Sequence, residues 1–232
     1  MSLRLYNSLT KGEEEFHPQA GKTVTMYTCG PTVYGRPHIG NYSSFLMADL
    51  IRRWLETGHN YTVKHVKNIT DVGHLVADAD EGEDKVEKEA RRIAVEKRGA
   101  GAAVTHDDVI AVARMYEAQY LEDEKTLNML EPFARPRASE YIEQMKTMIE
   151  KLLEKGHAYA TKDGLYFDVT SHLKTPYGTL SGNTLDHLDA GARVDVNEEK
   201  RHPADFALWK FCVGKNEHHL LRWSSPAGPA GE

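Results

Sequence analysis

The sequence predicts an α/β fold in which a parallel sheet with flanking helices is interrupted by a helical and hairpin insertion. Residues 23–67 have the order strand, long turn, helix and strand, which is typical of a right-handed β-α-β unit. Residues 139–155 show the apolar spacing of one helical face. An Asp-Gly pair between two short apolar runs at residues 157–169 indicates a hairpin.

The β-α-β unit begins with a strand at residues 23–28 (TVTMYT), which is rich in β-branched and aromatic residues. We expect a helix over residues 43–57, because apolar residues recur there at the spacing of one face. The residues of that face are Met47, Leu50, Ile51, Trp54 and Leu55. Asn41 or Ser43 is placed to cap the N-terminus of this helix, and Gly58 to cap its C-terminus.

The second strand of the unit is expected at residues 61–67. Residues 78–98 then form a charge run, which we interpret as the solvated face of a helix supported by i,i+4 ion pairs. Two further helices are expected at residues 109–129 and 139–155, and Gly156 ends the second.

Length and composition restrict the class of protein. The chain has 232 residues, of which 40% are hydrophobic and 28% are charged, as in a globular protein with a core. It contains no run near the roughly 18 apolar residues of a membrane helix, and its first residues lack a secretory signal. Two cysteines, Cys29 and Cys212, exclude a disulfide framework, so we expect a cytoplasmic protein. A net charge of −6 argues against a chain that mainly coats nucleic acid.

The turn after the first strand reads CGPTVYGRPHIGN, and parallel α/β sheets bind ligands at such a turn. It lacks the G-x-G-x-x-G fingerprint and the P-loop pattern, which disfavours NAD-type and P-loop chemistry. His38, Gly40 and Asn41 lie near the start of the helix, where free backbone N–H groups favour an anion. An imidazole there can donate to a phosphate oxygen, and a glycine lets a nucleotide approach the backbone. Taken alone, the motif fits a capping or packing histidine equally well.

The wider string YTCGPTVYGRPHIGN resembles the start of the cysteinyl-tRNA synthetases, which are class I aminoacyl-tRNA synthetases. The resemblance continues through VKNITDVGH, PRASEYIEQMKTMIEKLLEKGHAY, DGLYFDV, YGTLSG and GARVDVNEEKRHPADFALWK, and so covers nearly the whole chain. It implies a Rossmann-like nucleotide-binding fold. Residues 1–115 would be the first half of the catalytic domain, and residues 116–200 a connective insertion. Residues 201–232 would be the segment in which the chain starts to return to the catalytic domain.

The resemblance also implies the reaction, namely ATP-dependent activation of cysteine and its transfer to tRNA(Cys), with Mg²⁺ accompanying ATP. His38, Ile39, Gly40 and Asn41 would bind ATP, and His38 and Asn41 would stabilise the adenylation transition state. Asn41 stands where the family signature has a second histidine, and it can donate hydrogen bonds without a charge. The positions implied to contact the cysteinyl group or the adenylate are Cys29, Gly30, Thr32, Ser44, Asn68 and Thr70.

The resemblance implies that Cys29 is a zinc ligand, whereas its residue type and place alone indicate a small packed cysteine. Zinc binds thiolates readily, so the sulfur of a cysteine substrate could be a ligand too, which would separate cysteine from serine. A closed zinc site needs about four ligands, and the sequence identifies only Cys29. Cys212 with His218 and His219 offers a C-x₅-H-H spacing, but we interpret Cys212 as a packed or exposed thiol. Ordinary polar roles are expected for three other histidines, His65, His74 and His106.

Two other functions remain open. A ligase that joins cysteine to an amino sugar shares the adenylation half, but the contexts at residues 31–34 and 199–201 favour the tRNA enzyme. The second open function is that of a non-catalytic chain that binds nucleotide or a partner. It is motivated by the family's second cysteine ligand, Lys-Met-Ser-Lys-Ser loop and anticodon-binding region, which have no counterpart before Glu232. On this ground we expect the chain alone to be inactive and to self-associate through an uncovered sheet edge and apolar surface.

Overall fold

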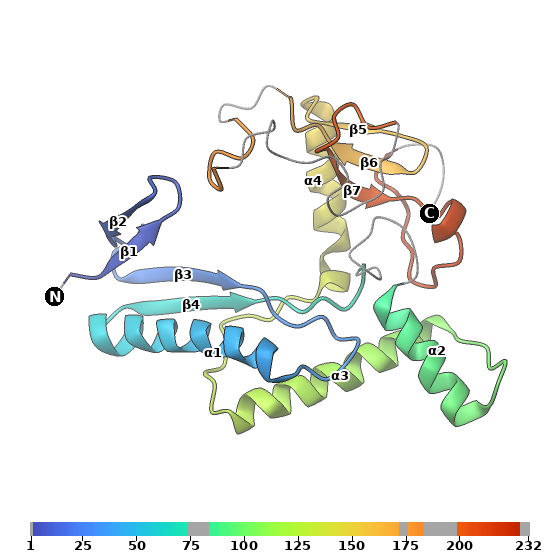
Figure 1. The fold of residues 1–232 in the computed structure, drawn as a ribbon, viewed down its shortest axis with the longest axis horizontal. Coiled ribbons are helices and arrows are strands. Elements are labelled where there is room, and N and C mark those ends of the chain that lie inside the picture. Colours follow the sequence, from blue (N-terminus) through green and yellow to red (C-terminus); the bar gives the residue numbers. More distant parts are fainter. Residues whose placement is uncertain (1, 74–83, 172–175, 183–198, 228–232) are drawn as a thin grey trace. The chain divides into compact units, whose positions relative to one another are not determined.

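The computed structural model describes residues 2–73, 84–171, 176–182 and 199–227 (Figure 1). The chain divides into two compact units. The first unit comprises Met1–Leu5, Glu14–His74 and Lys85–Tyr141, and the second comprises Tyr6–Glu13, Leu75–Asp84 and Ile142–Glu232. No helix of the described residues is long and apolar enough to cross a membrane.

The predicted β-α-β unit is present in the first unit (Figure 1). β3 (Thr23–Thr28) pairs in parallel with β4 (Thr62–Lys67), in register from the first residue of each strand to the last. α1 (Ile39–Arg53) connects them and continues as one π-helical turn, Trp54–Gly58. Leu55 at that turn packs in a core with Val24 and Val63 of the two strands. Both strand predictions and the parallel pairing are therefore confirmed.

The buried face of α1 is not the one that the apolar spacing indicated. The side chains that α1 buries are Tyr42, Phe45, Ala48 and Asp49. Four residues of the expected face are exposed: Met47 (61%), Leu50 (64%), Ile51 (43%) and Trp54 (59%). The helix has apolar residues on two sides, and the aromatic side is the one that packs, against Tyr120. The other side is exposed apolar surface of the kind expected above, and self-association of the chain stays a prediction.

Both caps of α1 also differ from the prediction. The N-cap is His38, not Asn41 or Ser43, and the helix therefore begins at Ile39. Gly58 does not cap the C-terminus, because it lies inside the π-helical turn. The left-handed conformation that ends the element is taken by Asn60, with φ 54°.

A segment to which the sequence analysis assigned no element extends the sheet. Ala134 and Arg137 form parallel bridges with Val66 and Ile69, on the edge of β4 and just beyond it. The N–H of Ile69 also donates to the carbonyl of Pro136 at 2.8 Å. A proline supplies no N–H to such a ladder, so the pairing is sparse and the segment lacks the residue pattern of a strand.

Two helices complete the first unit. α2 (Lys85–Arg98) confirms a helix in the charge run, whose residues 78–83 lie outside the described residues. α3 (His106–Thr126) follows it. The domain boundary expected between residues 115 and 116 falls inside α3. The boundaries of the two compact units thus differ from the domain boundaries expected from the sequence. Those expected boundaries stay a prediction.

The second unit contains the predicted helix and hairpin. After a 3₁₀ turn (Ala138–Tyr141), α4 (Ile142–Glu154) ends before Gly156, which has φ 73°. The strands of the unit form an antiparallel sheet in the order β5 (Ala158–Ala160), β6 (Gly164–Phe167) and β7 (Phe206–Lys210). The remaining described elements are a two-stranded sheet of β1 (Arg4–Asn7) and β2 (Gly12–Glu15) and a 3₁₀ turn at Gly214–Asn216.

Candidate nucleotide-binding site

The turn from β3 to α1 is joined to the chain that leaves β4. The N–H of Val33 donates to the carbonyl of Thr70 at 3.1 Å, and the N–H of Thr70 donates to the carbonyl of Pro31 at 3.0 Å. Thr32 and Thr70 form a parallel bridge between these bonds. The structure therefore brings together two of the residues expected to contact the cysteinyl group or the adenylate, at the carboxyl ends of parallel strands.

Asn68 holds the same turn through its side-chain amide. Its Oδ1 accepts hydrogen bonds from the N–H of Gly30 at 3.0 Å and from the hydroxyl of Tyr27 at 3.1 Å. Its Nδ2 donates to the hydroxyl of Thr70 at 3.1 Å. A Cβ at Gly30 would lie 1.7 Å from the carbonyl oxygen of Asn68, so this approach requires glycine. Asn68 thus fixes the peptide next to Cys29, a role that the sequence analysis did not assign to it.

His38 shapes the start of α1. Its Nδ1 accepts a hydrogen bond from the N–H of Gly40 at 3.0 Å, and the Oδ1 of Asn41 accepts one from the N–H of His38 at 3.0 Å. These two bonds form a capping box. Because Nδ1 accepts, the proton of the neutral ring is on Nε2, which makes Nε2 a donor. His38 therefore caps the helix, which was one of the interpretations of the sequence motif. Its Nε2–H remains available as a hydrogen-bond donor at the helix N-terminus.

The signature residues face solvent. His38, Gly40, Asn41 and Ser44 are all exposed, and Ile39 is 78% exposed. The first turn of α1 carries no acidic side chain, so nothing in it offsets the positive end of the helix dipole. An anion can therefore reach both the backbone N–H groups and the imidazole.

Cys29 is exposed at the end of β3, so its thiol is accessible to a soft metal ion. The described residues contain no group of three or more His, Cys, Asp or Glu side chains that could hold a metal ion. The described residues therefore do not by themselves form a closed zinc site.

The C-x₅-H-H spacing does not produce a metal site either. Cys212, His218 and His219 all belong to the described residues and form no such group. His218 is instead paired with Glu217 at 3.3 Å, and Cys212 is half-buried.

The other histidines expected to have ordinary roles are in no metal-binding group where they are described. His65 is buried in β4, and its Nε2 lies 2.8 Å from the hydroxyl of Thr28. Burial, with Lys67 and Arg52 nearby, lowers the pKa of His65. His106 is exposed beside Asp107. His74 lies outside the described residues.

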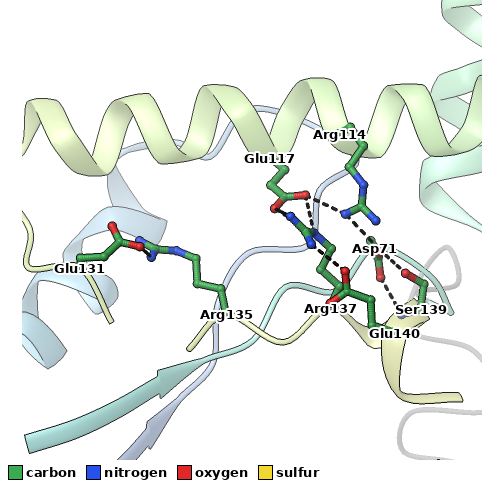
Figure 2. A network of polar contacts seen from close by, with 8 residues as sticks. All are labelled: Asp71, Arg114, Glu117, Glu131, Arg135, Arg137, Ser139 and Glu140. Carbon is green, nitrogen blue, oxygen red and sulfur yellow. Dashed lines mark hydrogen bonds and ion pairs between the residues drawn. The ribbon is translucent and has the colours of Figure 1, made fainter. Parts of the chain in front are cut away.

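A partly buried polar network lies at the chain just beyond Asn68 and Thr70 (Figure 2). Asp71 is fully buried and accepts from the N–H of Ser139 at 3.0 Å and from its hydroxyl at 2.6 Å. On α3, Glu117 pairs with Arg114 at 2.8 Å and with Arg137 at 2.7 Å. Burial would raise the pKa of Glu117, but the hydrogen bonds from Arg137 and Arg114 outweigh it and lower this pKa.

A second buried cluster lies beneath the end of β4. The Nζ of Lys67 lies 2.6 Å from Glu124, and both side chains are less than 5% exposed. Glu124 also accepts from the hydroxyl of Tyr120 at 2.5 Å and pairs with Arg135. Burial would raise the pKa of Glu124, but hydrogen bonds from Lys67 and Tyr120 lower it overall. No sequence pattern indicates either cluster, because their residues lie far apart along the chain.

Comparison with known families identifies the class. Residues 15–231 match the model of the class I (C) tRNA synthetase catalytic domain, so the chain belongs to the class I tRNA synthetases. This confirms the α/β fold class and the resemblance drawn from the sequence.

The curated relatives that we compared are cysteine–tRNA ligases. The chain is 43% identical to the cysteine–tRNA ligase of Chlorobium luteolum over 230 residues, covering 98% of this chain and 44% of that enzyme. It is 43% identical to the cysteine–tRNA ligase of Thermus thermophilus over 229 residues, with the same coverage of both chains. The cysteine–tRNA ligase of Bacteroides fragilis is 41% identical over 228 residues, which are 97% of this chain and 43% of that enzyme. The chain thus spans less than half the length of these curated relatives.

Proposed function

We propose that this chain supplies the first part of the active site of a cysteine–tRNA ligase, which uses ATP and Mg²⁺ to activate cysteine and then charges tRNA(Cys). One observation carries the proposal: an open helix N-terminus with an oriented imidazole, in a chain matched over 98% of its length by such a ligase. The amino-sugar ligase shares this chemistry, but the relatives named above are tRNA ligases.

The activation step is a displacement at the α-phosphorus of ATP. The ionised carboxylate of cysteine forms a bond to phosphorus, the bond to the β-phosphate oxygen breaks, and pyrophosphate leaves with that electron pair. Because the nucleophile is already anionic at neutral pH, no general base is required. Mg²⁺ bound with ATP would neutralise phosphate charge.

The residues of this chain would act by positioning and by stabilising charge. The Nε2–H of His38 would donate to a phosphate oxygen, because Nδ1 is held by Gly40 and fixes the ring orientation. The amide group of Asn41 and the first N–H groups of α1 would donate beside it. Ile39 would complete the ATP-binding turn.

On the substrate side, we propose contacts to the cysteinyl group or the adenylate from the strand ends and the start of α1. These contacts would come from Cys29, Gly30, Thr32, Ser44, Asn68 and Thr70. Cys29 is proposed as a zinc ligand, with the other ligands supplied from outside the described residues.

His38→Ala in the intact protein that carries this chain tests the activation step. We expect cysteine-dependent ATP–pyrophosphate exchange to fall by about 10²-fold, the scale for losing one transition-state donor. His106→Ala is the matched control, because His106 is also exposed at the start of a helix. An exchange rate within a few-fold of the unsubstituted protein would remove His38 from the mechanism. Offering tRNA(Cys) or an amino sugar as acceptor separates the two ligases.

Cys29→Ser tests the zinc assignment, and the metal content of the purified protein is measured directly. We expect less bound zinc and a larger loss of affinity for cysteine than for ATP. Cys212→Ser serves as the control and should leave both unchanged. Unchanged zinc together with unchanged cysteine affinity would refute the role of Cys29.

A further inference from the structure

The turn that carries His38 is tied to α3 by a salt bridge that the mechanism above does not use. The Nε of Arg36 donates to Asp123 Oδ2 at 2.9 Å, and its Nη2 donates to Oδ1 at 2.5 Å. This is the two-pronged pairing of a guanidinium with a carboxylate, which fixes direction as well as distance. The hydroxyl of Tyr42 donates to the same carboxylate at 2.8 Å.

Asp123 therefore holds the chain on both sides of His38. Arg36 lies two residues before it, and Tyr42 lies four residues after it, one turn into α1. The Tyr42 ring is buried and stacked on Tyr120, so its hydroxyl has little freedom to move.

The backbone between Arg36 and His38 is stiff. Pro37 has its φ locked by the ring, and a residue that precedes proline is kept out of the helical region. Fixing the guanidinium of Arg36 thus restricts where the His38 backbone lies. The opposite end of the turn is fixed by the bonds of Val33 and Pro31 to Thr70.

We propose that Asp123 is a positioning residue of the activation step, which acts through Arg36 and Tyr42 to set His38 against the phosphates of ATP. This inference rests on the proposed function. The side chain of Arg36 is 59% exposed, so the pair contributes little to stability, and its effect is on geometry. The hydrogen bond from Arg36 lowers the pKa of Asp123, which keeps the carboxylate ionised at neutral pH.

The competing interpretation is that Arg36 itself binds the triphosphate as a cation. The two interpretations differ in how the substitutions combine. If Arg36 acts through Asp123, removing both residues costs no more than removing one. If Arg36 binds phosphate directly, Arg36→Ala should cost activity whether or not Asp123 is present.

The test is a double-mutant cycle in the intact protein with Arg36→Ala, Asp123→Ala and the pair. We expect each single variant to lower the kcat of ATP–pyrophosphate exchange about 10-fold, since small misplacements of a catalytic group are costly, and the pair to lower it no further. Tyr42→Phe should lower it less. In the His38→Ala background, Asp123→Ala should have no further effect, which a merely structural role would not produce.

A second readout does not depend on activity. Hydrogen–deuterium exchange of the peptide spanning residues 33–42 should be faster in Asp123→Ala than in the unsubstituted chain. Arg98→Ala is the matched control, because it removes another exposed ion pair of the first unit, to Asp108 at 2.9 Å. Arg98→Ala should change neither readout.

The outcomes separate this inference from the proposed function. If His38→Ala lowers exchange with pyrophosphate but Asp123→Ala does not, the function stands and the positioning role is overturned. If the unsubstituted protein shows no cysteine-dependent exchange, the function fails, and unchanged deuterium uptake in Asp123→Ala would independently overturn the tie. Additive losses in the cycle would likewise overturn the tie, in favour of direct phosphate binding by Arg36.

Discussion

The two compact units differ in what they bury. Near the candidate site, the first unit buries side chains of charged residue types, among them Lys67, Asp71, Glu117 and Glu124. The second unit has an apolar cluster of Ile149, Leu165 and Phe211 between its helix and sheet. One of its buried carboxylates, Asp205, is bonded by neutral donors, including the hydroxyl of Tyr159 at 2.6 Å and the N–H of Val169 at 2.9 Å, and another, Asp168, pairs with Arg201 at 3.4 Å.

This difference follows from what each unit must hold in place. Apolar packing constrains volume, whereas charged hydrogen bonds constrain direction as well. In the first unit, α3 reaches the end of β4 with directional contacts, so the positions of Asn68 and Thr70 depend on them. We therefore expect the first unit to be sensitive to single charge removals and the second to losses of apolar volume.

The largest expected effect is from Glu124→Ala, which leaves Lys67 buried without its partner. Removing one member of a buried pair costs about 3–5 kcal/mol, so we expect a loss of that size in the free energy of unfolding. Denaturant titration measures it, and hydrogen exchange should localise it to the first unit. Glu122→Ala on the exposed side of α3 is the control. The double variant Glu124→Leu with Lys67→Met should recover much of the loss, and failure to do so would argue against an electrostatic origin.

Leu165→Ala is the counterpart in the second unit. Leu165 is fully buried between Ile149 and Phe211, so its truncation leaves a cavity and should cost about 3 kcal/mol. Faster hydrogen exchange should be confined to α4 and the β5–β7 sheet. Leu180→Ala, at a residue 63% exposed, should cost far less. Equal losses for the two leucines would contradict the assignment of this core.

In the second unit, the ionised carboxylate of Asp163 should stabilise the fold, and acid should remove this stabilisation. Burial would raise the pKa of Asp163, but hydrogen bonds from Lys210, Thr161 and Tyr166 lower it to about 2. Because this folded-state pKa is below the ordinary 3.8, the stabilisation is present above pH 4 and is lost as pH falls towards 2. Solvent screening keeps its size to about 1 kcal/mol.

Unfolding free energies of the unsubstituted chain and Asp163→Asn between pH 2 and 6 measure this contribution. The difference between the two should shrink as the pH falls below about 4, since the carboxyl group is then protonated. A difference independent of pH would show that the carboxylate charge contributes nothing. Glu117 and Glu124 of the first unit and Asp168 of the second also have lowered pKa values, so the acid sensitivity that remains should come from both units.

Local patterns predicted the local structure and part of the site. β-branched and alternating residues identified β3, β4 and the hairpin, and the family resemblance named Thr32 and Thr70, which form a bridge in the structure. The same patterns gave the wrong face of α1, because apolar spacing cannot tell which of two apolar sides is buried. They also missed contacts between distant residues. The salt bridge between Arg36 and Asp123 joins positions 87 apart, and a charged residue in a helix is ordinarily expected to face solvent.

The smallest expected stability effect compares two capping boxes of the first unit. At α3, Thr105 and Asp108 exchange hydrogen bonds of 2.9 and 3.2 Å, and at α1 His38 makes the corresponding bonds to Gly40 and Asn41. Thr105→Ala and His38→Ala should each cost about 1 kcal/mol, the usual loss for a helix N-cap, measured by denaturant titration. ATP binding should weaken only in His38→Ala, because only that box lies at the proposed phosphate site. Equal ATP affinity in the two variants would show that His38 only caps the helix, and that the capping box of α1 has no role in ATP binding.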